Sequence, residues 1–180
     1  MKKMIKKLGL LILIFLVLGT VYFGIFFTLV PPQYTTGYNA ALLDKVHRLE
    51  SIEEPKIILC GNSNLAFGID SKLIEEEIGM PVVNMGLHGG LGNKFLERCA
   101  LLNINEGDIL IVCHSNYSDN GKLGQTDLAW ITLENHKELW RIPDLQEWIE
   151  LLPALPDYAF NVLSLFFSGR GNVREDVFYA

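Results

Sequence analysis

The stretch KIILCGNSNLAFGID, residues Lys56–Asp70, decides the fold of this chain. Its first part, Ile57–Cys60, is a short apolar and β-branched run, typical of a parallel strand covered on both faces. Gly61 would allow the chain to turn sharply after that strand. A polar cluster then follows, namely Asn62, Ser63 and Asn64. Two interpretations are open: an ordinary turn, or a serine presented at the end of a strand for chemistry.

Two further strands are expected after this stretch, each preceded by a helix. The runs PVVNM (81–85) and ILIVC (109–113) predict the strands, and residues 69–80 and 92–103 predict the helices. Asp70 or Ser71 would cap the first helix and Gly79 would end it. This alternation predicts right-handed crossovers and a parallel sheet. The expected fold class is therefore α/β, a three-layer flavodoxin-like parallel sheet whose first three strands end near Cys60, Met85 and Cys113.

Apolar spacing predicts the other helices. Residues 41–52 carry apolar side chains at near-helical spacing and predict a helix that leads into the domain. Beyond Ser118 the pattern is looser, and helices are expected over 127–140, 143–152 and 157–167.

The N-terminal segment has the composition of a membrane anchor. Lys2, Lys3, Lys6 and Lys7 precede the uncharged run Leu8–Val30, which Pro31 and Pro32 end. About 20 apolar residues span a bilayer, whereas a cleaved signal has an apolar region of about 7–15 residues. We expect an uncleaved transmembrane signal anchor in the cell membrane, single-pass, with a cytoplasmic N-terminus and an extracytoplasmic domain.

The chain of 180 residues then divides into four parts. These are a cytoplasmic basic segment (1–7), the anchor (8–30), a juxtamembrane helix or linker (31–54) and one extracytoplasmic α/β domain (55–180). Four of the 15 basic residues precede the anchor and all 21 acidic residues follow it, so the outer part carries a net charge of −10. This charge argues against a nucleic-acid partner, because phosphate binding needs a basic surface.

The three cysteines, Cys60, Cys99 and Cys113, are expected to be free. Cys60 and Cys113 each end a predicted strand, which favours buried thiols. No C-x-x-C or H-x-x-x-H spacing indicates a metal site, and no cofactor is expected.

Polar loops follow all three predicted strands. They read GNSN after the first strand, NMGLHGGLGN after the second and HSNYSDNG after the third. In an open α/β sheet, ligands bind outside the carboxyl ends of the strands, so these loops are expected to share one crevice. The glycines of the second loop would let bare N–H groups approach a developing oxyanion.

This combination resembles the SGNH (GDSL-like) hydrolase and acyltransferase superfamily over roughly Ile57 to Tyr117. By that resemblance GNS makes Ser63 the nucleophile, and NMGLHGG makes Gly89 a backbone oxyanion donor after Asn84. HSNY makes Asn116 the side-chain oxyanion donor. The phrase FGIDSKLIEEEIGMPVVNMGLHGG is similar to membrane-anchored members that modify exported polysaccharides or teichoic acids. Substrate contacts are then expected from Asn62, Asn64, Asn84, His88 and His114.

The superfamily's last block, D-x-x-H, supplies the acid and the histidine base, and it does not occur after Ser63. The chain's one D-x-x-H, Asp44 to His47, precedes the serine and is expected to be a surface pair on a helix. His88 and His114 would contact substrate or bond their own loops, and His136 would be an exposed helix residue. We expect a chain that is truncated before the D-x-x-H block.

Three functions stay open at this point. The first is a serine-dependent esterase or O-acyltransferase acting on cell-envelope or exported glycans, or the N-terminal part of one. The second is a catalytically inactive relative that binds a glycan or a membrane acyltransferase partner. The third is an unrelated flavodoxin-like extracellular binding module.

Overall fold

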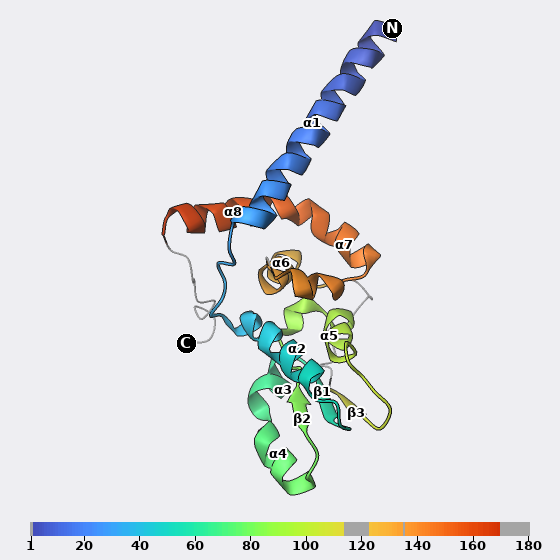
Figure 1. Ribbon diagram of the computed structural model, residues 1–180, viewed down its shortest axis with the longest axis vertical. Helices are drawn as coiled ribbons and strands as arrows, with labels where there is room; N and C mark the ends of the chain where they lie inside the picture. The colour runs from blue at the N-terminus through green and yellow to red at the C-terminus, as the bar shows by residue number, and fades with distance from the viewer. Residues whose placement is uncertain (1, 114–122, 135, 170–180) are drawn as a thin grey trace. The chain divides into compact units, whose positions relative to one another are not determined.

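The computed structural model describes residues 2–113, 123–134 and 136–169 and divides the chain into two units, Met1–Pro32 and Gln33–Ala180 (Figure 1). The N-terminal unit consists of helix α1, Lys2–Leu29. At about 1.5 Å per residue these 28 residues extend roughly 42 Å, more than the hydrocarbon core of a bilayer. Within the described ranges, α1 is the one helix long and apolar enough to cross a membrane.

The C-terminal unit contains a three-stranded parallel sheet of order β2-β1-β3. Its strands are β1 (Ile57–Gly61), β2 (Val82–Asn84) and β3 (Ile109–Cys113). Ile57 pairs with Val82 on one side and with Ile109 on the other. The α/β class, the parallel sheet and the three expected strands are therefore confirmed.

Helices make up most of the remainder of this unit. In chain order they are η1 (Tyr38–Ala40), α2 (Ala41–Ser51), α3 (Ser63–Gly68), α4 (Ser71–Ile78), η2 (Gly89–Leu91), α5 (Asn93–Ala100), α6 (Thr126–Leu133), η3 (Lys137–Arg141), α7 (Leu145–Leu151), η4 (Leu152–Ala154) and α8 (Leu155–Phe167). The short helix α3 was not predicted, because its six residues carry no helical apolar period.

The ends of α4 follow from local chemistry, as predicted. The Asp70 carboxylate accepts hydrogen bonds from the backbone N–H groups of Lys72 and Leu73. At the other end Gly79 adopts φ 72°, the left-handed conformation that favours glycine.

The single helix expected over residues 127–140 is wrong. Helix α6 ends at Leu133, and Glu134 adopts φ 40°. The buried Glu134 carboxylate accepts the backbone N–H groups of Gln33 and Tyr34, and its carbonyl accepts Trp140 Nε1 at 3.0 Å. These bonds to distant residues fix Glu134 outside the helix.

Charged side chains satisfy the outer edge of β2. Glu75 accepts the backbone N–H of Val82 at 3.0 Å, and Arg48 donates to the carbonyl of Val82 at 3.3 Å. Lys45 Nζ donates to the carbonyl of Asn84 at 2.6 Å. The helices α2 and α4 therefore protect this edge against further strand pairing.

The opposite edge strand, β3, is uncovered. Ile109, Ile111 and Val112 are 48%, 42% and 46% exposed, although every residue of β1 is buried. Because β3 is uncovered, the prediction of a buried Cys113 is wrong: its thiol is exposed, whereas Cys60 and Cys99 are buried.

Candidate functional site

Ser63 lies at the carboxyl end of β1, as the first residue of α3. Asn62 caps that helix, and its side-chain Oδ1 accepts the backbone N–H of Asn64 at 3.0 Å. Ser63 is half-buried and Asn64 is exposed. The serine is thus placed where the central strand passes into a helix, and the Asn62 side chain organises the turn.

Gly61 is required for close packing rather than for a sharp turn. It belongs to β1, and its φ is not among the positive values of the chain. A Cβ at this position would lie 2.5 Å from the carbonyl oxygen of Cys113. The absence of a side chain therefore lets β3 approach the end of β1.

The glycine-rich loop after β2 packs along the end of β1 and onto α3. Leu87 donates its N–H to the carbonyl of Gly61 at 3.2 Å. Asn84 Oδ1 accepts the N–H of Gly86 at 2.9 Å, and its Nδ2 donates to the carbonyl of Leu65 at 3.0 Å. The Asn84 side chain therefore joins the loop to α3.

Gly89 lies against the serine-bearing turn. A Cβ built on Gly89 would be 3.4 Å from the Cβ of Asn62, the residue that precedes Ser63. The next N–H, that of Gly90, donates to His88 Nδ1 at 2.9 Å. Within the described residues the Gly89 N–H has no hydrogen-bond acceptor.

The hydrogen bond to Gly90 determines the proton position on His88. A neutral imidazole that accepts at Nδ1 carries its proton on Nε2. In this tautomer Nε2 is a donor and cannot take a proton from a serine. His88 therefore organises its own loop in this arrangement.

Two other histidines belong to neither the Ser63 turn nor the Gly89 loop. His47, on α2, lies 2.9 Å from the Glu138 carboxylate, and both side chains are about half exposed. This hydrogen bond, together with the negative charge of Glu138, raises the pKa of His47. His136 precedes η3 and is only partly exposed, and burial lowers its pKa. The expectation of an exposed helix residue at His136 is therefore wrong.

The third loop predicted to join the site cannot be described. His114 and Asn116 lie outside the described residues. The structure thus brings together the Ser63 turn and the Gly89 loop, and it leaves the third loop as a prediction. In the part of the chain that the structure describes, no three His, Cys, Asp or Glu residues form a group able to hold a metal ion.

Sequence reasoning missed a polar pocket on the outer edge of β2. It is lined by Asp44, Lys45, Arg48, Ser71, Lys72, Glu75, Val82 and Asn84. Burial lowers the pKa of Lys45, whose ammonium bonds the Asn84 carbonyl. The pocket combines three cations with two carboxylates, and three of these side chains, Lys45, Arg48 and Glu75, also satisfy the strand edge. In the sequence, this pocket is indicated only by charged residues on α2 and α4, two helices that are not adjacent in the chain.

Comparison with known proteins identifies no relative of this chain. No family model, no curated protein and no solved structure matches this chain.

Proposed function

We propose that the chain is a membrane-anchored, SGNH-like ester hydrolase or O-acyltransferase that acts on cell-envelope or exported glycans. The observation that carries the proposal is the close approach of Gly89 to Asn62. A Cβ built on Gly89 would lie 3.4 Å from the Cβ of Asn62. This approach joins the two loops to which the resemblance assigns the nucleophile and the oxyanion donor. Both loops follow the carboxyl ends of adjacent parallel strands, where α/β folds bind ligands.

In the proposed reaction Ser63 Oγ attacks the carbonyl carbon of an acyl ester and loses its proton to a base. The ester C–O bond then breaks, the alcohol leaves with a proton, and Ser63 carries the acyl group as a new ester. The backbone N–H groups of Ser63 and Gly89, with the side chain of Asn116, would stabilise the oxyanion. Losing one such donor typically lowers kcat by about 10²–10³-fold. Water or a glycan hydroxyl would then accept the acyl group.

The second candidate is an inactive relative that binds a glycan or a membrane acyltransferase partner. The observation that favours it is the engagement of His88 Nδ1 with Gly90, together with the pairing of His47 with Glu138. A serine hydroxyl needs a base to react at neutral pH. This second candidate predicts little or no esterase turnover from the chain alone.

Chemical rescue tests the proposed site without requiring a base from the protein. The full chain in detergent is mixed with p-nitrophenyl acetate, with and without added imidazole, and acetylation is located by peptide mass mapping. We expect imidazole-dependent acetylation of Ser63, which is lost in Ser63→Ala and kept in the control Ser51→Ala. Ser51 lies at the end of α2, and its hydroxyl donates to the carbonyl of Arg48 in the same helix.

Equal acetylation across serines, with no dependence on Ser63, would refute the proposed site. Turnover of about 1 s⁻¹ or more without imidazole, lost in Ser63→Ala, would show that a base is present. Acetylation at Ser63 that stops there and never passes to water or a glycan would favour the inactive relative.

We also propose that α1 spans the cell membrane once, with Lys2, Lys3, Lys6 and Lys7 in the cytoplasm and the C-terminal unit outside. The lysine cluster before an uncharged run supports this orientation. Protease added to intact cells should digest the C-terminal unit. Complete protection in intact cells, with digestion after lysis, would reverse the orientation.

A further inference from the structure

Helices α7 and α8 carry large apolar side chains that the C-terminal unit does not cover. On α7 and the turn after it, Leu145, Ile149 and Leu152 are exposed, at spacings of four and three residues. On α8, Phe160 and Phe167 are 71% and 80% exposed and lie seven residues apart. These spacings put each set on one side of its helix.

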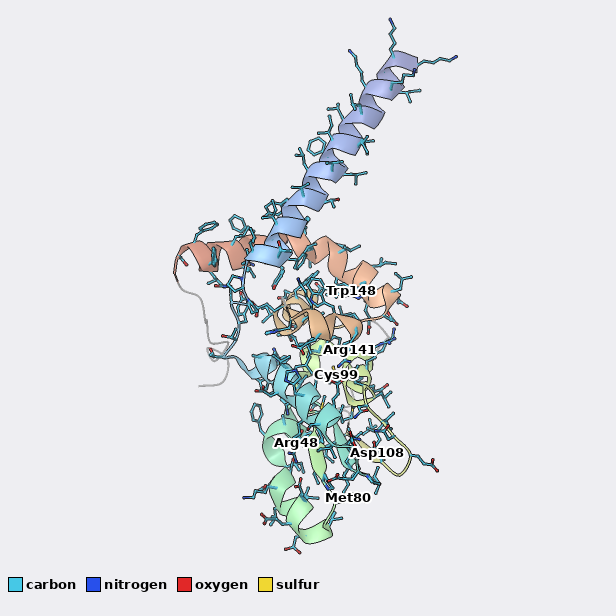
Figure 2. All side chains as sticks on the ribbon, viewed as in Figure 1. Arg48, Met80, Cys99, Asp108, Arg141 and Trp148 are labelled. Carbon is cyan, nitrogen blue, oxygen red and sulfur yellow. The ribbon has the colours of Figure 1, made fainter. Side chains whose placement is uncertain are left out.

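Both helices use their other side to pack against α6. Trp130 of α6 stacks on Tyr158 of α8, with ring centroids 5.1 Å apart, and donates its Nε1–H to the carbonyl of Leu151 at 2.9 Å. The exposed sides of α7 and α8 therefore both face away from α6. Figure 1 shows the two helices end to end across one end of the C-terminal unit, and Figure 2 shows ring side chains projecting from α8 on the side away from α6.

The same end of the unit receives the chain from α1. Gln33 and Tyr34, the first residues of the unit, donate their N–H groups to Glu134, which directly follows α6. Burial raises the pKa of Tyr158 of α8, and the nearby groups Glu134 and Tyr34 raise it further. Both groups therefore lie close to α8. The attachment of α1 is thus next to α8 within the fold of this unit.

The link to α1 is short. Only residues 30–32 separate the end of α1 from Gln33, and three residues reach at most about 11 Å. If α1 spans a bilayer, this link holds the attachment beside Glu134 close to the membrane surface, whatever the orientation of the unit.

We infer that the exposed apolar side of α7 and α8 lies in the outer headgroup and acyl boundary of the bilayer that α1 crosses. Its ligand is the lipid surface, and the contact is apolar. The segment 145–167 contains no lysine or arginine and three acidic residues, Glu147, Glu150 and Asp157. Attraction to anionic headgroups therefore does not contribute, and insertion depends on the aromatic and aliphatic side chains.

This contact would give the C-terminal unit a fixed face toward the membrane, as a second attachment beside the helix. It rests on the proposed spanning role of α1 but not on the proposed chemistry at Ser63.

Depth-dependent quenching of a fluorophore tests the contact in the full chain. In a Cys113→Ser background, where Cys60 and Cys99 are buried, single cysteines replace Phe160 or Leu145 and carry an NBD label. A label at Leu73, an exposed apolar residue of α4, is the matched control, and a label at Leu16 reports on α1. The proteins are reconstituted in phosphatidylcholine vesicles that contain lipids with a nitroxide at a shallow or a deep position.

We expect the shallow nitroxide to quench the labels at Phe160 and Leu145 but not the label at Leu73, and the deep nitroxide to quench Leu16. Adding phosphatidylglycerol or salt should leave the quenching at Phe160 unchanged. Quenching at Leu16 without quenching at Phe160 and Leu145 would overturn the contact and keep the anchor. Absence of quenching at all labelled positions would overturn both the membrane anchor and the contact. Quenching at Leu73 equal to that at Phe160 would overturn the assignment of the membrane-facing side. A blue shift at Phe160 that depends on protein concentration, without quenching, would assign the face to a second copy of the chain.

Discussion

The ammonium nitrogen of Lys56 lies 3.0 Å from Oδ2 of Asp108, and neither side chain is exposed to solvent. Asp108, labelled in Figure 2, also accepts the backbone N–H of Lys56 at 3.0 Å and that of Asn105 at 2.8 Å. The pair therefore joins the residue before β1 to the residue before β3, at the amino ends of two neighbouring strands. Removing one partner would leave the other charge buried alone.

We predict that Asp108→Asn lowers the free energy of unfolding by about 3–5 kcal/mol, the usual cost of breaking a buried ion pair. Asp127→Asn, at an exposed residue of α6, should change it by less than about 0.5 kcal/mol. Chemical denaturation of the full chain, followed by tryptophan fluorescence, measures both. The double variant Lys56→Met with Asp108→Leu has no buried charge at these two positions and should be more stable than Asp108→Asn. If it were not, the unpaired lysine would not be the cause of the lost stability in Asp108→Asn.

The same pair predicts a loss of stability in acid. Burial alone would raise the pKa of Asp108, but the hydrogen bonds from Asn105 and Lys56 outweigh it and hold that pKa below its ordinary value. A carboxyl whose folded pKa is depressed stabilises the fold above its unfolded pKa of about 3.9 and loses that contribution as pH falls through the folded value. Unfolding measured from about pH 6 down to about pH 2 should show this loss, and Asp108→Asn should flatten it. An unchanged acid profile in Asp108→Asn would contradict the assignment.

Two glycines of the loop after β2 should respond differently to alanine. A Cβ at Gly86 would lie 2.7 Å from the backbone nitrogen of Ala66, so the loop or α3 must move. At Gly89 the new Cβ makes an ordinary contact of 3.4 Å with the Cβ of Asn62. We expect Gly86→Ala to destabilise the protein by about 1–3 kcal/mol and Gly89→Ala to be close to neutral. Equal losses in the two variants would refute the packing of this loop on α3.

The three thiols should react at different rates. Cys113 is exposed, so a maleimide should modify it in the native protein. Cys60 is buried, and burial, with a smaller effect of Glu97, raises its pKa to about 12. Burial likewise raises the pKa of Cys99. At about pH 8 we expect one fast modification and two that appear only on unfolding, with mass mapping to identify each site. Rapid modification of Cys60 or Cys99 in the folded protein would contradict their burial.

His47 should titrate above its ordinary pKa because of its hydrogen bond to Glu138. A raised folded pKa stabilises the protein below the unfolded value of about 6.5, and this contribution disappears as pH rises through the folded value. The Glu138→Gln variant should lower the pKa of His47, measured by NMR of its ring protons. The melting temperature should change little, since both side chains are half exposed. If the variant left that pKa unchanged, a different group would control His47.

Features with local causes could be predicted from the sequence. The apolar runs beginning at Ile57 and Ile109 predicted two strands, and Asp70 and Gly79 predicted both ends of α4. The break after Leu133 could not be predicted in this way. It depends on hydrogen bonds between Glu134 and the backbone of Gln33, 101 residues earlier in the chain.

Burial was harder to predict than secondary structure. The runs IILC and ILIVC have the same apolar character, yet β1 is covered and β3 is not, because burial depends on position in the sheet. Lys56 is fully buried although lysine is normally exposed, since Asp108 is its partner. At the candidate site, the topology predicted that the Ser63 and Gly89 loops would meet. A hydrogen bond from His88 to its own loop was one of the two expected roles of that residue, and the Gly90 N–H does donate to His88 Nδ1. The bond by which Asn84 joins this loop to Leu65 could not be predicted.

The difference between the two sheet edges gives the sheet a direction of growth. Ile109 donates to the carbonyl of Lys56, so the backbone groups of Leu110 and Val112 point away from β1. Within the described residues these groups have no capping side chain of the kind that satisfies Val82. Of the two edges of the described sheet, β3 is therefore the better template for an added strand, and an apolar edge of this kind is a starting point for intermolecular cross-β association. A lysine in place of Val112 is the substitution best placed to suppress such association during expression and storage.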